Sequence, residues 1–286
     1  MSLVSTVVVL MLAAPLPQVA SQSKPASSPA FEQASANPGN TTAIVPQQLR
    51  RAAPPPTNAS AEQLESIGDS LRGENLFADA LDYYRAAMKK ADSPVLHDKA
   101  GIAELQMVRH EEARREFERA IKMDKHYAEA YNNLGVIAYF HKKYGKANKL
   151  YKKAIELRDE NASFHSNYGA ALFAEKAYEK AFNEYSRALR LDPEIFDHTS
   201  RTGVIMRPAS VADRAHYDYV IAKIYASQGN PDRCLLYLRK AMEDGYSQIN
   251  DVYKDGSFIA IRKDPRFVSL MAQRPVSIPD TNPPNQ

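Results

Sequence analysis

The residues that could catalyse a reaction or bind a metal are scattered along this chain. None of the seven histidines stands four residues from another, so the zinc-binding HExxH pattern is absent. Cys234 is the only cysteine, which leaves no internal disulfide and no thiolate cluster for zinc or iron–sulfur. The sequence also lacks GxSxG, Walker and GxGxxG motifs. We therefore expect no catalytic residue, no metal site and no cofactor, and the chain is not expected to be an enzyme.

Two asparagines are better placed for binding than for catalysis. Asn133 and Asn167 stand 34 residues apart. An amide side chain both donates and accepts hydrogen bonds, so such a pair could bind the backbone of an extended peptide. The simpler interpretation is that each amide bonds to neighbouring backbone.

A stripe of lysines is the clearest charged feature. Their spacings of 4, 3 and 4 residues place them on one helix face. They are Lys142, Lys146, Lys149 and Lys153, with Lys143 and Lys152 beside them. The stripe is either a solvated helix face or a contact for anionic lipid, glycan or nucleic acid. Nucleic acid is disfavoured because no base-stacking aromatic residues interleave with the lysines.

A recurring unit of about 34 residues shows which elements must position these side chains. Its copies begin at Ala61, Pro94, Ala128, Ala162 and Ala215. Three positions are small in all five copies. The eighth is Gly68, Gly101, Gly135, Gly169 and Ala222; the twentieth is Ala80, Ala113, Ala147, Ala181 and Cys234; the twenty-seventh is Ala87, Ala120, Ala154, Ala188 and Ala241. Position 24 is large: Tyr84, Phe117, Tyr151, Tyr185 and Leu238.

This pattern predicts two antiparallel helices per unit. Small side chains at positions 8 and 20 let paired helices approach closely, and position 27 lets the next unit dock. A single unit cannot bury its apolar face, so several units must stack. A buried packing role is therefore expected for Cys234, at position 20, and for His97 and His165, both at position 4.

The repeat resembles the tetratricopeptide repeat family of the bacterial exported type over about residues 61–243. The third unit matches the signature through Tyr131, Leu134, Gly135, Ala147, Tyr151 and Ala154, and the fourth matches it through Tyr168, Gly169, Ala181, Tyr185, Ala188 and Pro193. No unit has Trp at position 4, and the second has Glu104 where a large apolar residue is usual. The resemblance implies an all-α fold, a right-handed helical-repeat solenoid of about five helix–turn–helix units with a C-terminal helical cap.

We expect the following organisation along the chain. Residues 1–21 are an apolar signal peptide, or an uncleaved inner-membrane anchor, because no basic residue precedes the apolar run. The remaining segments are a disordered Pro/Ser/Ala-rich linker at 22–58, four units at 59–193, an insertion at 194–214, the fifth unit at 215–245, a helical cap at 246–273 and a disordered tail at 274–286. A periplasmic or secreted protein follows from this interpretation.

The family's first helices line a concave groove, and the resemblance places the binding site there. The implied groove residues are Ile102, Leu105, Asn132, Asn133, Val136, Tyr139, Phe140, Asn167 and Phe173. The family's chaperone-binding carboxylate clamp is missing, since Glu65 and Asp69 stand in the matching first-unit positions. The insertion is expected to be extended around residues 202–208 and could itself occupy the groove.

The expected function is protein–protein interaction or scaffolding in envelope assembly, with a peptide or protein segment held in the groove. The partner's identity and the oligomeric state are not evident from the sequence, and nucleic acid is not expected as a partner. The alternative is a self-associating structural or spacer protein that touches an anionic surface through the lysine stripe.

Overall fold

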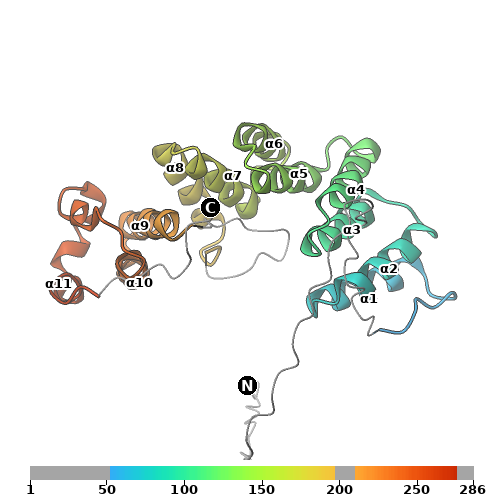
Figure 1. The fold of residues 1–286 in the computed structure, drawn as a ribbon, viewed down its shortest axis with the longest axis horizontal. Coiled ribbons are helices and arrows are strands. Elements are labelled where there is room, and N and C mark those ends of the chain that lie inside the picture. Colours follow the sequence, from blue (N-terminus) through green and yellow to red (C-terminus); the bar gives the residue numbers. More distant parts are fainter. Residues whose placement is uncertain (1–51, 197–209, 276–286) are drawn as a thin grey trace, which may run out of the picture. The chain divides into compact units, whose positions relative to one another are not determined.

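The computed structural model describes residues 52–196 and 210–275 (Figure 1). Every regular element in these two ranges is helical, which confirms the all-α repeat fold expected from the sequence. The predicted signal peptide, most of the predicted linker, the middle of the insertion and nearly all of the C-terminal tail lie outside the described residues.

The helices form five consecutive antiparallel pairs, which Figure 1 shows side by side. The pairs are α1 (Ala61–Gly73) with α2 (Phe77–Met88), α3 (Pro94–Gln106) with α4 (His110–Met123), α5 (Ala128–Phe140) with α6 (Tyr144–Leu157), α7 (Ala162–Ala174) with α8 (Tyr178–Leu191), and α9 (Val211–Ser227) with α10 (Pro231–Glu243). The second helix of each of the first four pairs also contacts the first helix of the next pair. Each unit therefore buries its apolar surface between its own two helices and against the neighbouring units.

The close approach of paired helices rests on a glycine facing an aromatic ring. A Cβ added to Gly68, Gly101, Gly135 or Gly169 would stand 2.5–2.7 Å from the ring at position 24 of the same unit. These rings belong to Tyr84, Phe117, Tyr151 and Tyr185, all completely buried. Glycine therefore recurs at position 8 because the ring that covers it leaves no room for a Cβ.

The turn within each unit holds one residue with positive φ, at position 15. These residues are Asn75, Val108, Lys142, Lys176 and Gly229, with φ between 56° and 72°. Glycine and asparagine adopt this conformation readily, whereas a β-branched residue is strained in it. Val108 is therefore the strained member of the set.

A C-terminal cap follows α10. It consists of the short 3₁₀ helices η1 (Ile249–Tyr253), η2 (Gly256–Phe258) and η3 (Ile261–Lys263), followed by α11 (Pro265–Ala272). Asp264 caps α11 by accepting a hydrogen bond from the backbone N–H of Arg266 at 2.8 Å, and Pro265 is its first residue. The Lys223 ammonium on α9 lies 2.9 Å from the Asp255 carboxylate and ties the cap to the fifth unit.

The fifth unit begins earlier than the predicted boundary of residue 215. Its first helix, α9, starts at Val211, because Ser210 Oγ accepts a hydrogen bond from the backbone N–H of Asp213 at 3.0 Å. The end of the predicted insertion is thus the first turn of α9. Residues 197–209 lie outside the described part of the chain.

The end of the predicted linker is ordered, which corrects the expectation of disorder through residue 58. The backbone N–H of Ala52 donates to Asp79 Oδ1 at 3.1 Å, and Tyr83 Oη donates to the Ala53 carbonyl at 3.1 Å. Lys90 Nζ adds a hydrogen bond to the Thr57 carbonyl at 2.9 Å. Composition underestimated order here because the stabilising groups come from α2 and the residues just after it, not from the segment itself.

Candidate functional site

A ladder of buried polar side chains runs along the first helices of units two to four. Asn167 Nδ2 on α7 donates to Asn132 Oδ1 at 3.0 Å. Asn132 Nδ2 donates to Asn133 Oδ1 at 3.1 Å, and Asn133 Nδ2 donates to Asp98 Oδ1 on α3 at 2.8 Å. All four side chains are buried, so the ladder joins three consecutive units from inside the fold.

Asp98 is the charged end of this ladder. Burial raises the pKa of its carboxyl to about 7, although the hydrogen bond from Asn133 favours the ionised form. The neighbouring Glu129 carboxylate raises this pKa further, while Arg72 and Lys99 lower it. The carboxyl of Asp98 therefore changes protonation within the neutral range.

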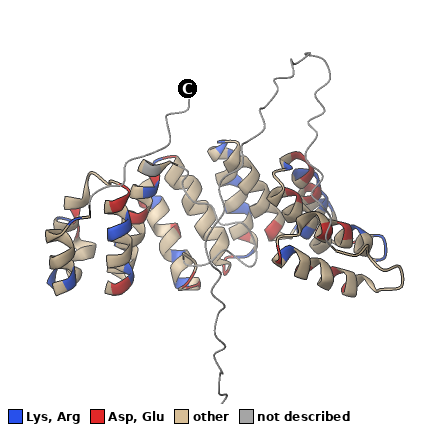
Figure 2. Ribbon diagram, turned by 60° about the horizontal axis from the view of Figure 1, so that its bottom comes forward, with Lys and Arg blue, Asp and Glu red and all other residues tan. Residues whose placement is uncertain are grey.

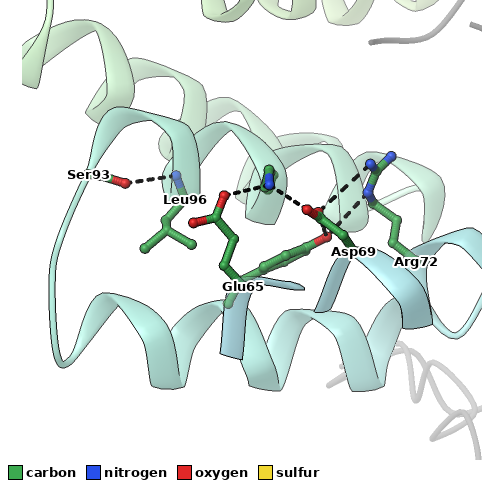
Figure 3. Close-up of polar contacts among 7 residues, drawn as sticks. Glu65, Asp69, Arg72, Ser93 and Leu96 are labelled. Carbon is green, nitrogen blue, oxygen red and sulfur yellow. Dashed lines mark hydrogen bonds and ion pairs between the residues drawn. The ribbon is translucent and has the colours of Figure 1, made fainter. Parts of the chain in front are cut away.

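A separate ion network fills the same face of units one and two (Figure 3). Lys99 Nζ lies 2.5 Å from Glu65 Oε1 and 2.6 Å from Asp69 Oδ2, so one ammonium on α3 bridges two carboxylates of α1. Tyr84 Oη donates to Asp69 Oδ1 at 2.9 Å. In Figure 3, the carboxylates of Glu65 and Asp69 point toward the same ammonium. Lys99 occupies the position that is Asn133 and Asn167 in the next two units, and there it binds the acidic first unit.

The predicted groove is largely closed, which corrects the expectation that its residues face a partner. Seven of the nine predicted residues are buried: Ile102, Leu105, Asn132, Asn133, Val136, Asn167 and Phe173. The amides of Asn132 and Asn133 bond within the ladder, to each other, to Asp98 and to Asn167. Only Tyr139, which is half-buried, and Phe140, with 47% of its surface exposed, remain accessible.

Two of the exposed large apolar side chains of the described residues, Val108 and Phe140, lie at the helix turns of units two and three. We define the edge patch as Val108, His110, Phe140 and His141. Val108 is 74% exposed and Phe140 is 47% exposed. The His110 ring stacks on Phe140 with centroids 5.4 Å apart and meets His141 edge-on at 5.2 Å. The patch therefore joins the turn after α3 to the end of α5.

His110 of the edge patch stays neutral at physiological pH more readily than a free histidine. Burial is the main cause that lowers the pKa of His110, and the nearby His141 lowers it further. A neutral imidazole ring stacked on phenylalanine is an apolar surface with a hydrogen-bonding edge. The arrangement suits contact with an apolar or aromatic side chain of a partner.

The sequence reasoning missed three members of this patch, Val108, His110 and His141. The family resemblance assigned binding to positions on the groove, whereas these residues stand at the turn. A comparison of position 15 across the five units would have found Val108, because it is the only β-branched residue there.

Other residues singled out in the sequence have structural roles. Cys234 is completely buried, and burial raises the pKa of its thiol to about 12, as expected of an inert packing residue. His97 Nδ1 lies 2.6 Å from Glu116, and His165 Nδ1 lies 2.8 Å from Glu184, so both position-4 histidines pair with the second helix of their unit. Glu104 is buried between Arg85 and Arg109, at 3.0 and 3.2 Å, which explains a carboxylate at this usually apolar position.

Within residues 52–196 and 210–275, no group of three or more His, Cys, Asp or Glu side chains is arranged to hold a metal ion. In the same ranges, no helix combines the length and apolar character needed to cross a bilayer.

Comparison with known proteins agrees with the repeat. The family model for the tetratricopeptide repeat matches residues 128–161, which are the third unit. No curated protein sequence matches the chain.

Similar solved structures belong to proteins of low sequence identity. MamA from Desulfovibrio magneticus RS-1 is 17% identical, with a TM-score of 0.44, over 68% of this chain and 99% of that one. A thermophilic TPR protein of Thermus thermophilus is 16% identical, with a TM-score of 0.47, over 74% of this chain and 100% of that one. YrrB, described as a TPR protein with an unusual peptide-binding site, is 18% identical, with a TM-score of 0.42, over 68% of this chain and 92% of that one.

Proposed function

We propose that this chain, whose third unit matches the tetratricopeptide repeat, is an interaction module that holds a peptide or protein segment at the edge patch. The observation that carries the proposal is the exposure of Val108 and Phe140 beside the stacked ring of His110. Apolar and aromatic side chains with hydrogen-bonding neighbours are typical of the centre of a protein interface.

The strain at Val108 supports the same site. A β-branched residue in the left-handed region costs free energy that asparagine or glycine would avoid. Val108 is also 74% exposed, so burial of its side chain within the fold offsets little of this conformational free energy. Contact with a partner would bury this apolar surface and would explain why a strained residue stands at this position.

The buried ladder favours the edge patch over the centre of the groove. A peptide that bound Asn133 or Asn167 would have to replace the hydrogen bond that each makes to Asn132 and separate buried groups. A partner at the edge patch needs no such opening, and Tyr139 lies next to Phe140 at the accessible end of the groove. We propose that the chain acts in the cell envelope, as a scaffold in envelope assembly, because residues 1–21 are predicted to be an export signal.

Photo-crosslinking tests the proposal directly. A photoreactive phenylalanine analogue at position 140 should give adducts with specific proteins in an envelope extract. The same analogue at Ile259, which is 58% exposed in the C-terminal cap, is the matched control and should give none of them. Equal adducts from both positions would contradict a binding site at the edge patch.

A pair of double variants provides the second readout. Val108→Asn with Phe140→Gln removes both exposed apolar side chains. Asparagine also adopts the positive φ at position 108, so a loss of binding would not result from a disturbed turn. Partner capture should fall about tenfold or more, the effect of removing an interface hot spot. Ile259→Gln with Val268→Gln removes an equally exposed pair elsewhere and should leave capture unchanged. Adducts of twice the chain mass would identify a second copy as the partner and favour the self-associating alternative.

A further inference from the structure

A row of exposed lysines runs from the turn before α6 along that helix. Lys142 adopts the positive φ of the turn and Lys143 is the N-cap, so the prediction that Lys142 shares a helix face with Lys146, Lys149 and Lys153 is wrong. Lys142, Lys146, Lys149 and Lys153 are all exposed, as are Lys143 and Lys152 beside them. Among the described residues, one ion pair within this group is found, between Lys153 Nζ and Glu156 at 3.3 Å. From residue 142 to residue 153 there are six lysines and no acidic residue.

The equivalent helices of the neighbouring units balance their charges. Helix α4 has four acidic and four basic side chains, and Arg114 pairs with Glu111 at 2.6 Å and with Glu118 at 2.9 Å. Helix α8 has two acidic and three basic side chains, whereas α6 has one acidic and four basic side chains. Figure 2 colours basic residues blue and acidic residues red, and both colours alternate along several helices. The excess on α6 is therefore not a general property of the second helices.

The chemistry of the stripe indicates the kind of surface it fits. Lysine is a compact, strongly hydrated point charge without the planar fork that lets arginine recognise one phosphate or carboxylate in a fixed geometry. No large apolar side chain is exposed between residues 142 and 157, so the stripe has nothing to insert into hydrocarbon or to stack on a base. A row of exposed lysines along a helix thus fits an extended anionic surface at which charges attract without specific docking.

We infer that the lysine stripe of α6 contacts the surface of an anionic lipid bilayer. The apolar run in residues 1–21 is predicted to take the chain across a membrane or to hold it there, so a leaflet surface is the polyanion that this chain meets. The stripe is a different surface from the edge patch, although Lys142 directly follows His141. Lipid contact would therefore present the edge patch close to the membrane.

Vesicle co-sedimentation of the full chain tests this inference. Binding is measured to vesicles of phosphatidylcholine alone and to vesicles that also contain phosphatidylglycerol, at about 0.1 M and about 1 M salt, where the Debye length is about 10 and 3 Å. The ratio of the two binding constants cancels any contribution of the N-terminal apolar run to both kinds of vesicle. We expect a large ratio at low salt that approaches unity at high salt.

Two variants that lose the same charge locate the effect. One replaces Lys142, Lys146, Lys149 and Lys153 by Gln, and the control replaces Lys122, Lys125, Lys180 and Lys263, four exposed lysines spread over the chain. Each lysine near an anionic surface changes binding about fivefold, so the stripe variant should lose about 100-fold or more of the ratio. The control should lose only a small part, and circular dichroism confirms that both variants stay helical.

Three outcomes would overturn the inference. The first is a wild-type ratio close to unity at low salt. The second is an equal loss in the stripe variant and the dispersed control, which would reduce the effect to net charge. The third is capture of the wild-type chain by soluble polyglutamate or by DNA, but not by anionic vesicles, which would assign the stripe to another polyanion.

Discussion

The first four units and the fifth unit solve the same packing problem in different ways. In units one to four, a glycine at position 8 lies under an aromatic ring from position 24. In unit five the pair is Ala222 and Leu238, both completely buried. At position 8, Ala222 is larger than glycine, and at position 24, Leu238 is smaller and more adaptable than an aromatic ring. The two positions are therefore constrained as a pair.

The contacts between units differ in the same way. Units two to four are joined by the polar ladder from Asp98 to Asn167. In unit five the corresponding positions are Tyr219 and Val220, and aromatic rings join this unit to unit four: Phe173 lies 5.2 Å from His216 and Tyr185 lies 5.5 Å from Tyr217. The repeat pattern thus specifies backbone geometry, while the side chains between units can be polar or aromatic. Exchanging residues between the two kinds of unit therefore tests which features the fold requires.

The largest effect is expected from Gly135→Ala. Its new Cβ would stand 2.6 Å from Cε1 of the buried Tyr151 ring, and overpacking of this kind costs roughly 1–3 kcal/mol. The better helix propensity of alanine returns at most about 1 kcal/mol. We expect a net loss of about 2 kcal/mol in the free energy of unfolding, measured by urea titration.

The double variant Gly135→Ala with Tyr151→Leu copies the pair found in unit five. It should be more stable than the sum of the two single changes predicts, with a coupling of about 1–2 kcal/mol. Additive losses would show that the two positions are independent. Ala222→Gly in unit five is the matched control: it relieves no clash and should only lose about 1 kcal/mol of helix propensity.

A smaller effect is expected from Asp98→Asn, which extends the amide ladder by one member. The folded-state pKa of about 7 lies above the value in an unfolded chain, so the fold prefers the protonated carboxyl. The stability from this preference is present below about pH 4 and is lost as pH rises through about 7, by up to about 1.4 kcal/mol per pH unit. The asparagine variant should lack this decline and be about 1–2 kcal/mol more stable than wild type at pH 8.

The control for this variant is Asn132→Asp, which moves the charge to the same position of unit three. It should introduce a decline with rising pH where wild type has an uncharged amide. Unfolding measured from pH 4 to pH 9 checks both changes. Identical pH profiles for wild type and Asp98→Asn would mean that Asp98 stays ionised throughout.

The packing of positions 8 and 24 could be predicted from the sequence, because the steric exclusion makes a small and a large residue recur at these positions. Gly135 and Tyr151 are small and large in the same order as three other pairs, so the repeat itself revealed the packing. The ladder left no such trace. Asn133 and Asn167 are one repeat apart, but the bridging Asn132 and the buried partner Asp98 stand at a different repeat position. Only coordinates show that these side chains meet.

The binding surface was predicted less well than the fold for a related reason. The family resemblance identifies positions on the first helices, and it cannot tell whether Val136 or Phe173 is covered within this chain. The edge patch depends on a turn conformation and on the stacking of His110 across units. Neither property follows from residue spacing.

The smallest effect concerns the turn at position 15, where unit two has Val108 and unit five has Gly229 with nearly the same positive φ. Val108→Asn should stabilise the chain by about 1 kcal/mol, because asparagine accepts the left-handed conformation with less strain. Gly229→Val should destabilise it by a similar amount, since nothing within 4 Å of an added Cβ would clash and the cost is conformational. If Val108→Asn instead destabilises the chain, the valine side chain contributes packing within the fold. Its 74% exposure would then be no indication of a partner.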